Sequence, residues 1–301
     1  MSRIIKLTLL AIIAADVLFF GVVRTPVRLY ALSAVGRSGC PLDGTLESFQ
    51  NAKRMHALRE EFQKGVHVAQ RDASGLELWD TPRGQTWMPS KDHILPFLLS
   101  EQEQRIYGTG ERGVHAGDVV LDCGANVGMF TRTALASGAG LVIAIEPAPV
   151  TLECLRRNLA KEIAQGRVIV YPKGVWDKDD FLDLTLNDGN AGENSVVLGR
   201  NAAEKVRVPL TTIDKIVEEL HLTRVDFIKM DIEGAEKNAL TGARETLRRF
   251  RPRMAISSEH LPDDTQKIPA LVSRLRPDYR LGFNACEDEG SKVEPMVLQF
   301  Y

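Results

Sequence analysis

VDFIKMDIEGAE (residues 225–236) is the stretch that decides the fold, because a short apolar run leads directly into two acidic residues and a helix start. Asp231 and Glu233 stand where the chain could simply turn, and Gly234 follows them. Carboxylates are poor strand residues and are costly to bury, so their position at the mouth of a buried strand needs a reason. Ligands bind at the carboxyl ends of the strands in open α/β sheets. The stretch therefore predicts a buried strand whose end carries functional groups.

Strand-like runs alternate with helical segments from about residue 117 onward. The runs are 119–124, 141–147, 167–176, 225–232 and 251–260, and the helical segments include 128–139, 150–165 and 235–250. Such alternation predicts a mostly parallel sheet with helices on both faces. Residues 180–211 interrupt it with two extra strand-like runs around the loop 187–195. The runs 279–283 and 296–301 are typical of two final strands that pair antiparallel at the end of the sheet.

The other strand ends carry residues that suit a nucleoside-containing cofactor. The first run ends in DCGANVG (122–128), where Gly124 and Gly128 allow a sharp turn and a close approach to a ligand. Glu146 ends the second run and can accept hydrogen bonds from ribose hydroxyls. Asp177 follows the third run behind two apolar residues, which suits one polar contact to an adenine edge. Purely structural roles remain open for both residues, since Glu146 could be an ordinary residue at the end of a strand and Asp177 could be a turn residue.

The spacing of the glycines separates two classes of cofactor. Nicotinamide dinucleotides are bound by G-x-G-x-x-G, whereas these glycines are four positions apart and Asp122 stands two residues before the first. A carboxylate at that point repels a pyrophosphate but suits a positive sulfonium and an amino group. The motif favours S-adenosylmethionine, and a nicotinamide-dependent oxidoreductase is the alternative.

Four segments resemble successive motifs of the FkbM family of S-adenosylmethionine-dependent methyltransferases. They are VVLDCGANVGMFT, AIEPAPVTLECLRRNL, VPLTTIDKI and FIKMDIEGAEKNALTGA, in the family's order and spacing over about residues 117–260. The resemblance implies a class I methyltransferase (Rossmann-like) α/β fold with a mostly parallel seven-stranded sheet and helices on both faces. It also implies methyl transfer, usually to an oxygen of a small molecule or sugar. Cys123 and Met230 depart slightly from the family pattern, and residues 1–100 lie outside the resemblance.

The resemblance also assigns the cofactor-binding positions. By motif position they are Asp122, Gly124, Asn126, Gly128 and Glu146. Asp122 and the glycine turn are expected to hold the methionine part, Glu146 the ribose and Asp177 the adenine.

The catalytic candidates are Asp231, Glu233 and His260. Asp231 could accept a hydroxyl proton, Glu233 could orient the acceptor or bind the cofactor's amino end, and His260 is a second candidate base. Alternatively, the two carboxylates could merely cap the following helix, and His260 could be a structural histidine. A divalent metal site of these three residues with Glu259 is a further alternative, although a site without metal is expected.

The bulk composition is that of an ordinary globular protein. The 301 residues are 44% hydrophobic and 26% charged, and a net charge of −2 provides no electrostatic footprint for nucleic acid. The four cysteines show no metal-binding spacing and are expected to be unpaired thiols in a reducing compartment. They are Cys40, Cys123, Cys154 and Cys286.

The N-terminal third differs from the rest of the chain. Residues 7–23 are apolar apart from a threonine and an aspartate and would span roughly 25 Å as a helix, so a membrane anchor is expected over residues 1–24. A cleaved signal peptide and an interfacial helix are the alternatives. Residues 25–109 are expected to form a linker and a lid or docking subdomain, and residues 110–301 the catalytic domain.

These observations together predict a membrane-anchored methyltransferase that uses S-adenosylmethionine. The acceptor is expected to be a small molecule, a glycan or a lipid-linked sugar. Because the cofactor is a cytosolic metabolite, the catalytic domain is expected to face the cytosol. A non-catalytic, membrane-tethered nucleoside-binding module is the alternative from another functional class.

Overall fold

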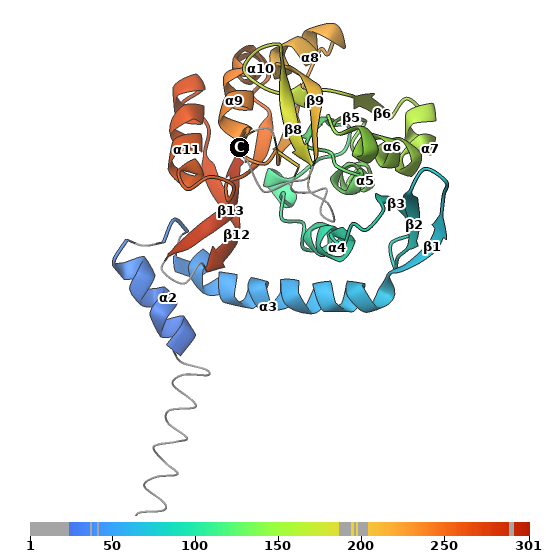
Figure 1. Cartoon of the computed structure of the whole chain (residues 1–301). Helices are drawn as coiled ribbons and strands as arrows, with labels where there is room; N and C mark the ends of the chain where they lie inside the picture. The colour runs from blue at the N-terminus through green and yellow to red at the C-terminus, as the bar shows by residue number, and fades with distance from the viewer. Residues whose placement is uncertain are drawn as a thin grey trace, which may run out of the picture.

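A seven-stranded sheet forms the centre of the described part of the chain (Figure 1). The computed structural model describes residues 24–36, 38–40, 42–186, 194–195, 197, 204–288 and 292–301. The strand order across the sheet is β12 (Leu281–Asp288), β13 (Val293–Phe300), β11 (Arg253–Ser257), β10 (Phe227–Met230), β4 (Val119–Cys123), β5 (Leu141–Ile145) and β6 (Val168–Tyr171). Neighbouring strands from β11 to β6 are parallel, whereas β13 runs antiparallel to both β11 and β12. The predicted parallel sheet with an antiparallel finish is confirmed.

Alternating side chains of the central strands enter two separate cores. Ile228 packs in one core, and its neighbour Phe227 packs in the other. Helices α8 (Ile213–Glu219), α9 (Glu236–Thr241), α10 (Arg244–Phe250) and α11 (Asp264–Leu275) contribute to the first core, and α5 (Met129–Ala136) and α6 (Pro149–Asn158) to the second. The short helix α7 (Ala160–Ala164) follows α6. Burial on both faces explains why these strands are near-continuous apolar runs.

A small sheet lies beside the central one. It consists of β7 (Gly174–Val175), β8 (Asp180–Leu186) and β9 (Glu204–Thr211), in the order β7-β9-β8. The two extra strands predicted within 180–211 are confirmed, whereas most of the loop 187–195 lies outside the described residues.

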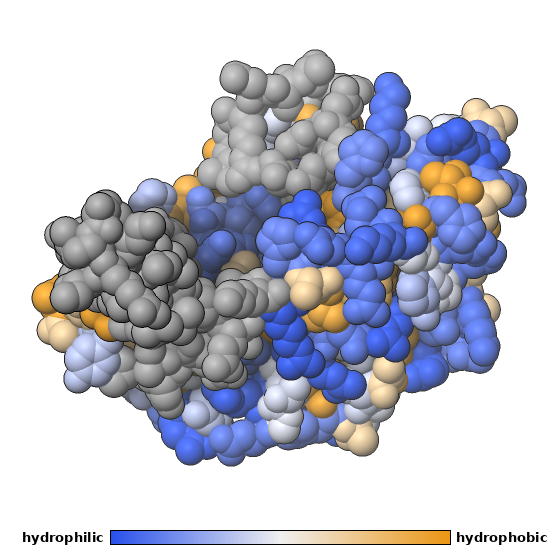
Figure 2. Space-filling view, turned by 90° about the horizontal axis from the view of Figure 1, so that it is seen from below, coloured by the Kyte–Doolittle hydropathy of each residue, from blue (hydrophilic) through white to orange (hydrophobic). Residues whose placement is uncertain are grey.

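The N-terminal part wraps around one side of the sheet. Its elements are α2 (Arg24–Ala34), α3 (Leu42–Gly65), β1 (His67–Arg71), β2 (Leu76–Asp80), β3 (Thr86–Pro89), α4 (Leu95–Gln104) and the short helix η2 (Gly110–Arg112). Figure 1 shows α3 running from the β12–β13 hairpin to the β1–β3 sheet. Strand β1 was not predicted, because its mostly exposed side chains lack an apolar pattern and backbone pairing with β2 holds it. Seen from below, the described surface is mainly hydrophilic (Figure 2).

The expected membrane anchor over residues 1–24, and with it the expected membrane location, is corrected. In the described part of the chain, no helix is both long enough and apolar enough to cross a bilayer. Helix α2 has 11 residues and spans about 16 Å, and the 24-residue α3 carries charged residues along its length. The apolar stretch 7–23 itself lies outside the described residues.

The expectation of four unpaired thiols is wrong for two of them. Cys40 and Cys286 form a disulfide although they are 246 residues apart, whereas Cys123 and Cys154 are free and buried. Beside the disulfide, the Gly39 amide donates a hydrogen bond to the Val293 carbonyl at 2.8 Å. The segment before α3 is therefore attached to the edge of the central sheet by a covalent bond and by backbone pairing.

Candidate active site

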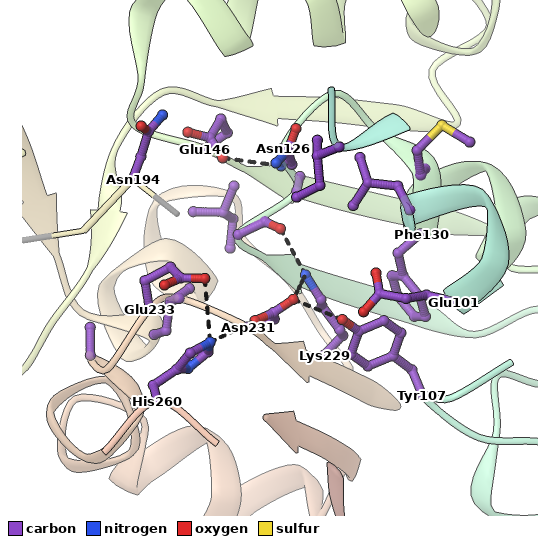
Figure 3. A pocket seen from close by; sticks show the side chains of 18 of the residues that line it. Glu101, Tyr107, Asn126, Phe130, Glu146, Asn194, Lys229, Asp231, Glu233 and His260 are labelled. Carbon is purple, nitrogen blue, oxygen red and sulfur yellow. Dashed lines mark hydrogen bonds and ion pairs between the residues drawn. The ribbon is translucent and has the colours of Figure 1, made fainter. Parts of the chain in front are cut away.

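A pocket of about 630 Å³ opens at the carboxyl ends of the parallel strands β4, β5, β10 and β11. Helix α4 provides part of the opposite wall through Phe97 and Glu101. In the close view, Asn126 lies beside Glu146, and a separate group of polar side chains gathers around His260 (Figure 3). One cavity therefore has two chemically distinct ends.

Close contact between two strand exits imposes a glycine at the start of the first loop. Gly124 has a positive φ of 77°, and a Cβ atom there would lie 1.9 Å from the backbone oxygen of Asp231. No side chain fits at this distance, so the β4 exit can pass under the β10 exit only as glycine. Asn126, with φ of 50°, completes the turn and lines the pocket.

Glu146 is anchored to the backbone at the end of β5. Its two carboxylate oxygens accept hydrogen bonds from the amides of Asn126 at 3.0 Å and Ala148 at 2.8 Å. Burial raises the pKa of Glu146 to about 7, and these two backbone hydrogen bonds oppose the rise. Each carboxylate oxygen retains a second lone pair, which can accept a hydrogen bond from a hydroxyl group of a ligand.

Asp122 lies beneath the pocket and is not among the residues that line it. The carboxylate is fully buried, accepts a hydrogen bond from the Thr131 hydroxyl at 2.6 Å and lies 3.6 Å from the Lys229 ammonium. Burial raises the pKa of Asp122, against the attraction of Lys229. Asp122 therefore does not contact the pocket itself, but it forms an ion pair with Lys229, which does line the pocket.

Lys229 is a pocket residue that sequence reasoning missed. It lies in the middle of β10 and is 4% exposed, and its ammonium donates a hydrogen bond to the Gly124 carbonyl at 2.7 Å. The ammonium also lies 3.7 Å from the Asp231 carboxylate. Burial opposes the charge, but Asp231 and Asp122 raise the pKa of Lys229 above its ordinary value. The signal was present in the sequence, because a lysine inside the apolar run FIKM must have a buried partner.

Asp231 is held from two sides. Its Oδ2 accepts a hydrogen bond from the Tyr107 hydroxyl at 2.7 Å, and its Oδ1 lies 3.4 Å from His260 Nε2. Burial would raise the pKa of Asp231, but Lys229 and His260 lower it below the ordinary value. Tyr107 was also missed, because it precedes the resemblance and lies 124 residues from its partner.

His260 joins the carboxylates that follow β10. Its Nε2 lies 3.4 Å from Glu233 Oε1, and its Nδ1 contacts Glu236 Oε1 at 2.9 Å. Burial alone would lower the pKa of His260, but Glu233 and Glu236 raise it to about 12. In the absence of another cation, His260 is therefore an imidazolium ion at neutral pH.

Two further expected site residues lie outside the pocket. Gly128 has φ of 94° at the start of α5 and packs against Leu155 and Leu159. Asp177 is exposed and accepts a hydrogen bond from Asn238 at 3.1 Å. Neither residue lines the pocket.

The helix-cap alternative for the acidic pair does not describe the structure. Ala235 is the N-cap residue of α9, and no side chain caps it. The geometry agrees with the metal-site alternative for three of its four residues. Ligand atoms of Asp231, Glu233 and His260 lie within 4.8 Å of one another, and Glu259 is not in this group.

The pocket end around His260 is acidic overall. Glu101, Glu259 and Glu287 line the same cavity. Burial, with the nearby Asp231 charge, raises the pKa of Glu101 well above its ordinary value and that of Glu259 to about 7. This end of the pocket therefore favours neutral hydrogen-bond donors and cations over anions.

A family model described as "Methyltransferase FkbM domain" matches residues 122–283. The chain is 26% identical to "31-O-demethyl-FK506 methyltransferase FkbM" of Streptomyces tacrolimicus over an alignment of 157 residues, and the match covers 43% of this chain and 60% of that protein. It is 27% identical to "Hexuronic acid methyltransferase AglP" of Haloferax volcanii over 189 residues, covering 61% of this chain and 68% of the relative. The match thus spans less than two thirds of the first of these relatives.

Among solved structures, the fold is similar to that of a methyltransferase FkbM from Methylobacillus flagellatus KT. The TM-score is 0.51 at 22% identity, and the match covers 69% of this chain and 52% of that one. This likeness supports the methyltransferase-like α/β fold.

Proposed function

Because the chain belongs to the methyltransferase FkbM family, we propose that it transfers a methyl group from S-adenosylmethionine to a hydroxyl oxygen of a small-molecule or sugar acceptor. The observation that carries this proposal is that the two ends of one pocket differ in their chemistry. The Gly124 turn and Glu146 lie at one end, and Asp231, Glu233 and His260 lie at the other. Such a pocket can hold a nucleoside and an acceptor next to each other.

The residues of the first end fit the cofactor in two respects. Glu146 presents a backbone-anchored carboxylate to the pocket, as a ribose diol requires. The Gly124 turn leaves the backbone open to close approach by a ligand. Asp122 would act indirectly, by fixing the Lys229 ammonium that in turn holds the Gly124 carbonyl. When bound, S-adenosylmethionine supplies an electrophilic methyl group on a positively charged sulfur.

The residues of the second end suit the binding and deprotonation of a hydroxyl group. Asp231 is kept ionised by Lys229 and His260, and it would accept the hydroxyl proton of the acceptor. Glu233 would accept a second hydrogen bond from the acceptor. His260 is protonated in this arrangement, so its role would be to hold the two carboxylates in position. Positioning supplies much of the rate of such a displacement.

The acceptor class is supported by the relatives and by the charge of the pocket. One relative's name specifies a 31-O-demethyl acceptor, and another's specifies a hexuronic acid. The acidic wall at the His260 end would repel a carboxylate, so the hexuronic acid relative supports a sugar as the acceptor class, whereas the charge of this pocket favours a neutral sugar or small molecule with a free hydroxyl group.

The test is calorimetric titration of S-adenosylmethionine and S-adenosylhomocysteine into the full chain. Binding is expected in the micromolar range, and Glu146→Ala should weaken it at least tenfold. Glu153→Gln is the matched control, since Glu153 pairs with Arg157 on the surface of α6, outside the pocket. Failure of the folded wild-type chain to bind either compound would refute the proposal. Binding without methyl transfer to any of a panel of hydroxylated acceptors would instead favour a non-catalytic nucleoside-binding module.

A further inference from the structure

We propose that Asp231, Glu233 and His260 form a binding site for a divalent cation of the Mg²⁺ and Mn²⁺ class at the acceptor end of the pocket. The site itself follows from the geometry of this chain, and only the role of the cation rests on the proposed methyl transfer. Carboxylate oxygens and a neutral imidazole nitrogen are suitable ligands for such ions, so the cation would displace the Nε2 proton of His260 to solvent.

The spacing of the ligand atoms fits a cation between them. His260 Nε2 lies 3.4 Å from both Asp231 Oδ1 and Glu233 Oε1. Charge-assisted hydrogen bonds between nitrogen and oxygen are shorter, about 2.7–2.9 Å. At the bond length of about 2.0–2.1 Å that Mg²⁺ requires, ligands at right angles to one another lie about 2.8–3.0 Å apart, and at about 2.4 Å they lie about 3.4 Å apart. The observed 3.4 Å is longer than such a hydrogen bond and about 0.4 Å wider than the ideal for Mg²⁺, so a bound ion would draw the three side chains slightly together.

A buried carboxylate orients the histidine as in metal sites. Glu236 is fully buried, and its Oε1 contacts His260 Nδ1 at 2.9 Å and accepts the amide of Ile232 at 3.0 Å. Metal-binding histidines almost always donate their second ring nitrogen to a carboxylate or carbonyl in this way. Figure 3 shows the opposite side of the ring, with Nε2 directed toward Glu233 and Asp231.

An unpartnered buried carboxylate oxygen adds to the negative charge beside the three ligands. Glu236 Oε2 is buried and has no hydrogen-bond partner among the described atoms. Three carboxylates thus surround a single imidazole, and the Lys229 ammonium that faces Asp231 is shared with Asp122. Such an excess of buried negative charge is costly. A divalent ion at the three ligand atoms would offset it.

The ligands are accessible from the pocket. The side chain of Asp231 is 28% exposed, that of Glu233 13% and that of His260 6%. All three line the cavity, so water and an acceptor oxygen can fill the remaining coordination positions of an ion. A cation bound there would hold the acceptor oxygen and lower the pKa of its hydroxyl group.

The experiment is a titration of the full chain with Mn²⁺, followed by electron paramagnetic resonance of free Mn²⁺. One ion per chain is expected to bind, with a dissociation constant that Mg²⁺ raises by competition. Glu233→Gln should weaken binding at least tenfold, and Glu236→Gln about 10- to 100-fold through the loss of histidine orientation. Glu245→Gln is the control, because this exposed carboxylate pairs with Arg248 away from the pocket. It should leave Mn²⁺ binding unchanged.

Calorimetry with S-adenosylhomocysteine on the same samples separates the two proposals. Nucleoside binding without saturable Mn²⁺ binding would overturn the cation site and leave the methyltransferase proposal standing, with His260 a fixed imidazolium. Mn²⁺ binding that Glu233→Gln and Glu236→Gln do not change would also overturn it. Mn²⁺ binding that both variants weaken, in a chain that binds no nucleoside, would support the site and refute the cofactor. Unfolding curves of the variants confirm that the comparison is made on folded protein.

Discussion

Replacing Lys229 by methionine tests whether the buried ammonium holds the two strand ends together. Methionine has nearly the same length, so the change removes the charge and little of the packing. Lys229 is 4% exposed and lies 3.6 Å from Asp122, which is fully buried. Breaking a buried ion pair by removing one partner costs about 3–5 kcal/mol. Lys229→Met should therefore lower the free energy of unfolding by about that amount, measured by urea denaturation with tryptophan fluorescence.

The loss should depend on pH in a defined direction. Burial already raises the pKa of Asp122, and without Lys229 this pKa rises further. A carboxyl group with a raised pKa in the folded state stabilises that state at low pH and loses this contribution as pH rises through its folded pKa. The difference between wild type and Lys229→Met should therefore be smaller at pH 5 than at pH 8.

Two further variants make the prediction refutable. Adding Asp122→Asn to Lys229→Met should recover about 1–3 kcal/mol, because the unpaired buried charge is removed. Lys161→Met, at an exposed position of α7, is the matched control and should change stability by less than about 0.5 kcal/mol. A loss below about 1 kcal/mol for Lys229→Met, or a further loss on adding Asp122→Asn, would show that Lys229 does not stabilise Asp122.

Three other predictions follow from single contacts. If ionised Glu146 holds the ribose, its pKa of about 7 means that nucleoside affinity should fall about tenfold from pH 8 to pH 6, and titration calorimetry of Glu146→Gln should show no such dependence. Gly124→Ala should weaken nucleoside binding at least tenfold in the same assay, because its Cβ would lie 1.9 Å from the Asp231 carbonyl; affinity equal to wild type would contradict the close approach. Cys286→Ser removes the bond to Cys40 and should lower the free energy of unfolding by about 2–4 kcal/mol in non-reducing urea titrations, with no effect once dithiothreitol is present.

Much of the sheet could be predicted because its signals are local. Apolar runs bounded by glycine and acidic residues predict strands and their ends, and parallel pairing brings those ends to one edge. Glu146, Gly124, Asp231 and Glu233 all follow strands, and all four line the pocket. Strand β1 escaped prediction because backbone pairing, and not an apolar pattern, holds it.

The sequence by itself determined which strands carry polar groups at their ends and which family the motifs resemble. Only the tertiary structure decided which of those groups meet. Asp122, near the end of β4, turns toward Lys229 and Thr131 beneath the pocket, and Asp177, after β7, lies on the surface. Tyr107 reaches Asp231 from outside the recognised motifs. The physical reason is that periodicity reports the face of an element, whereas contacts between distant segments depend on side-chain direction and packing in three dimensions.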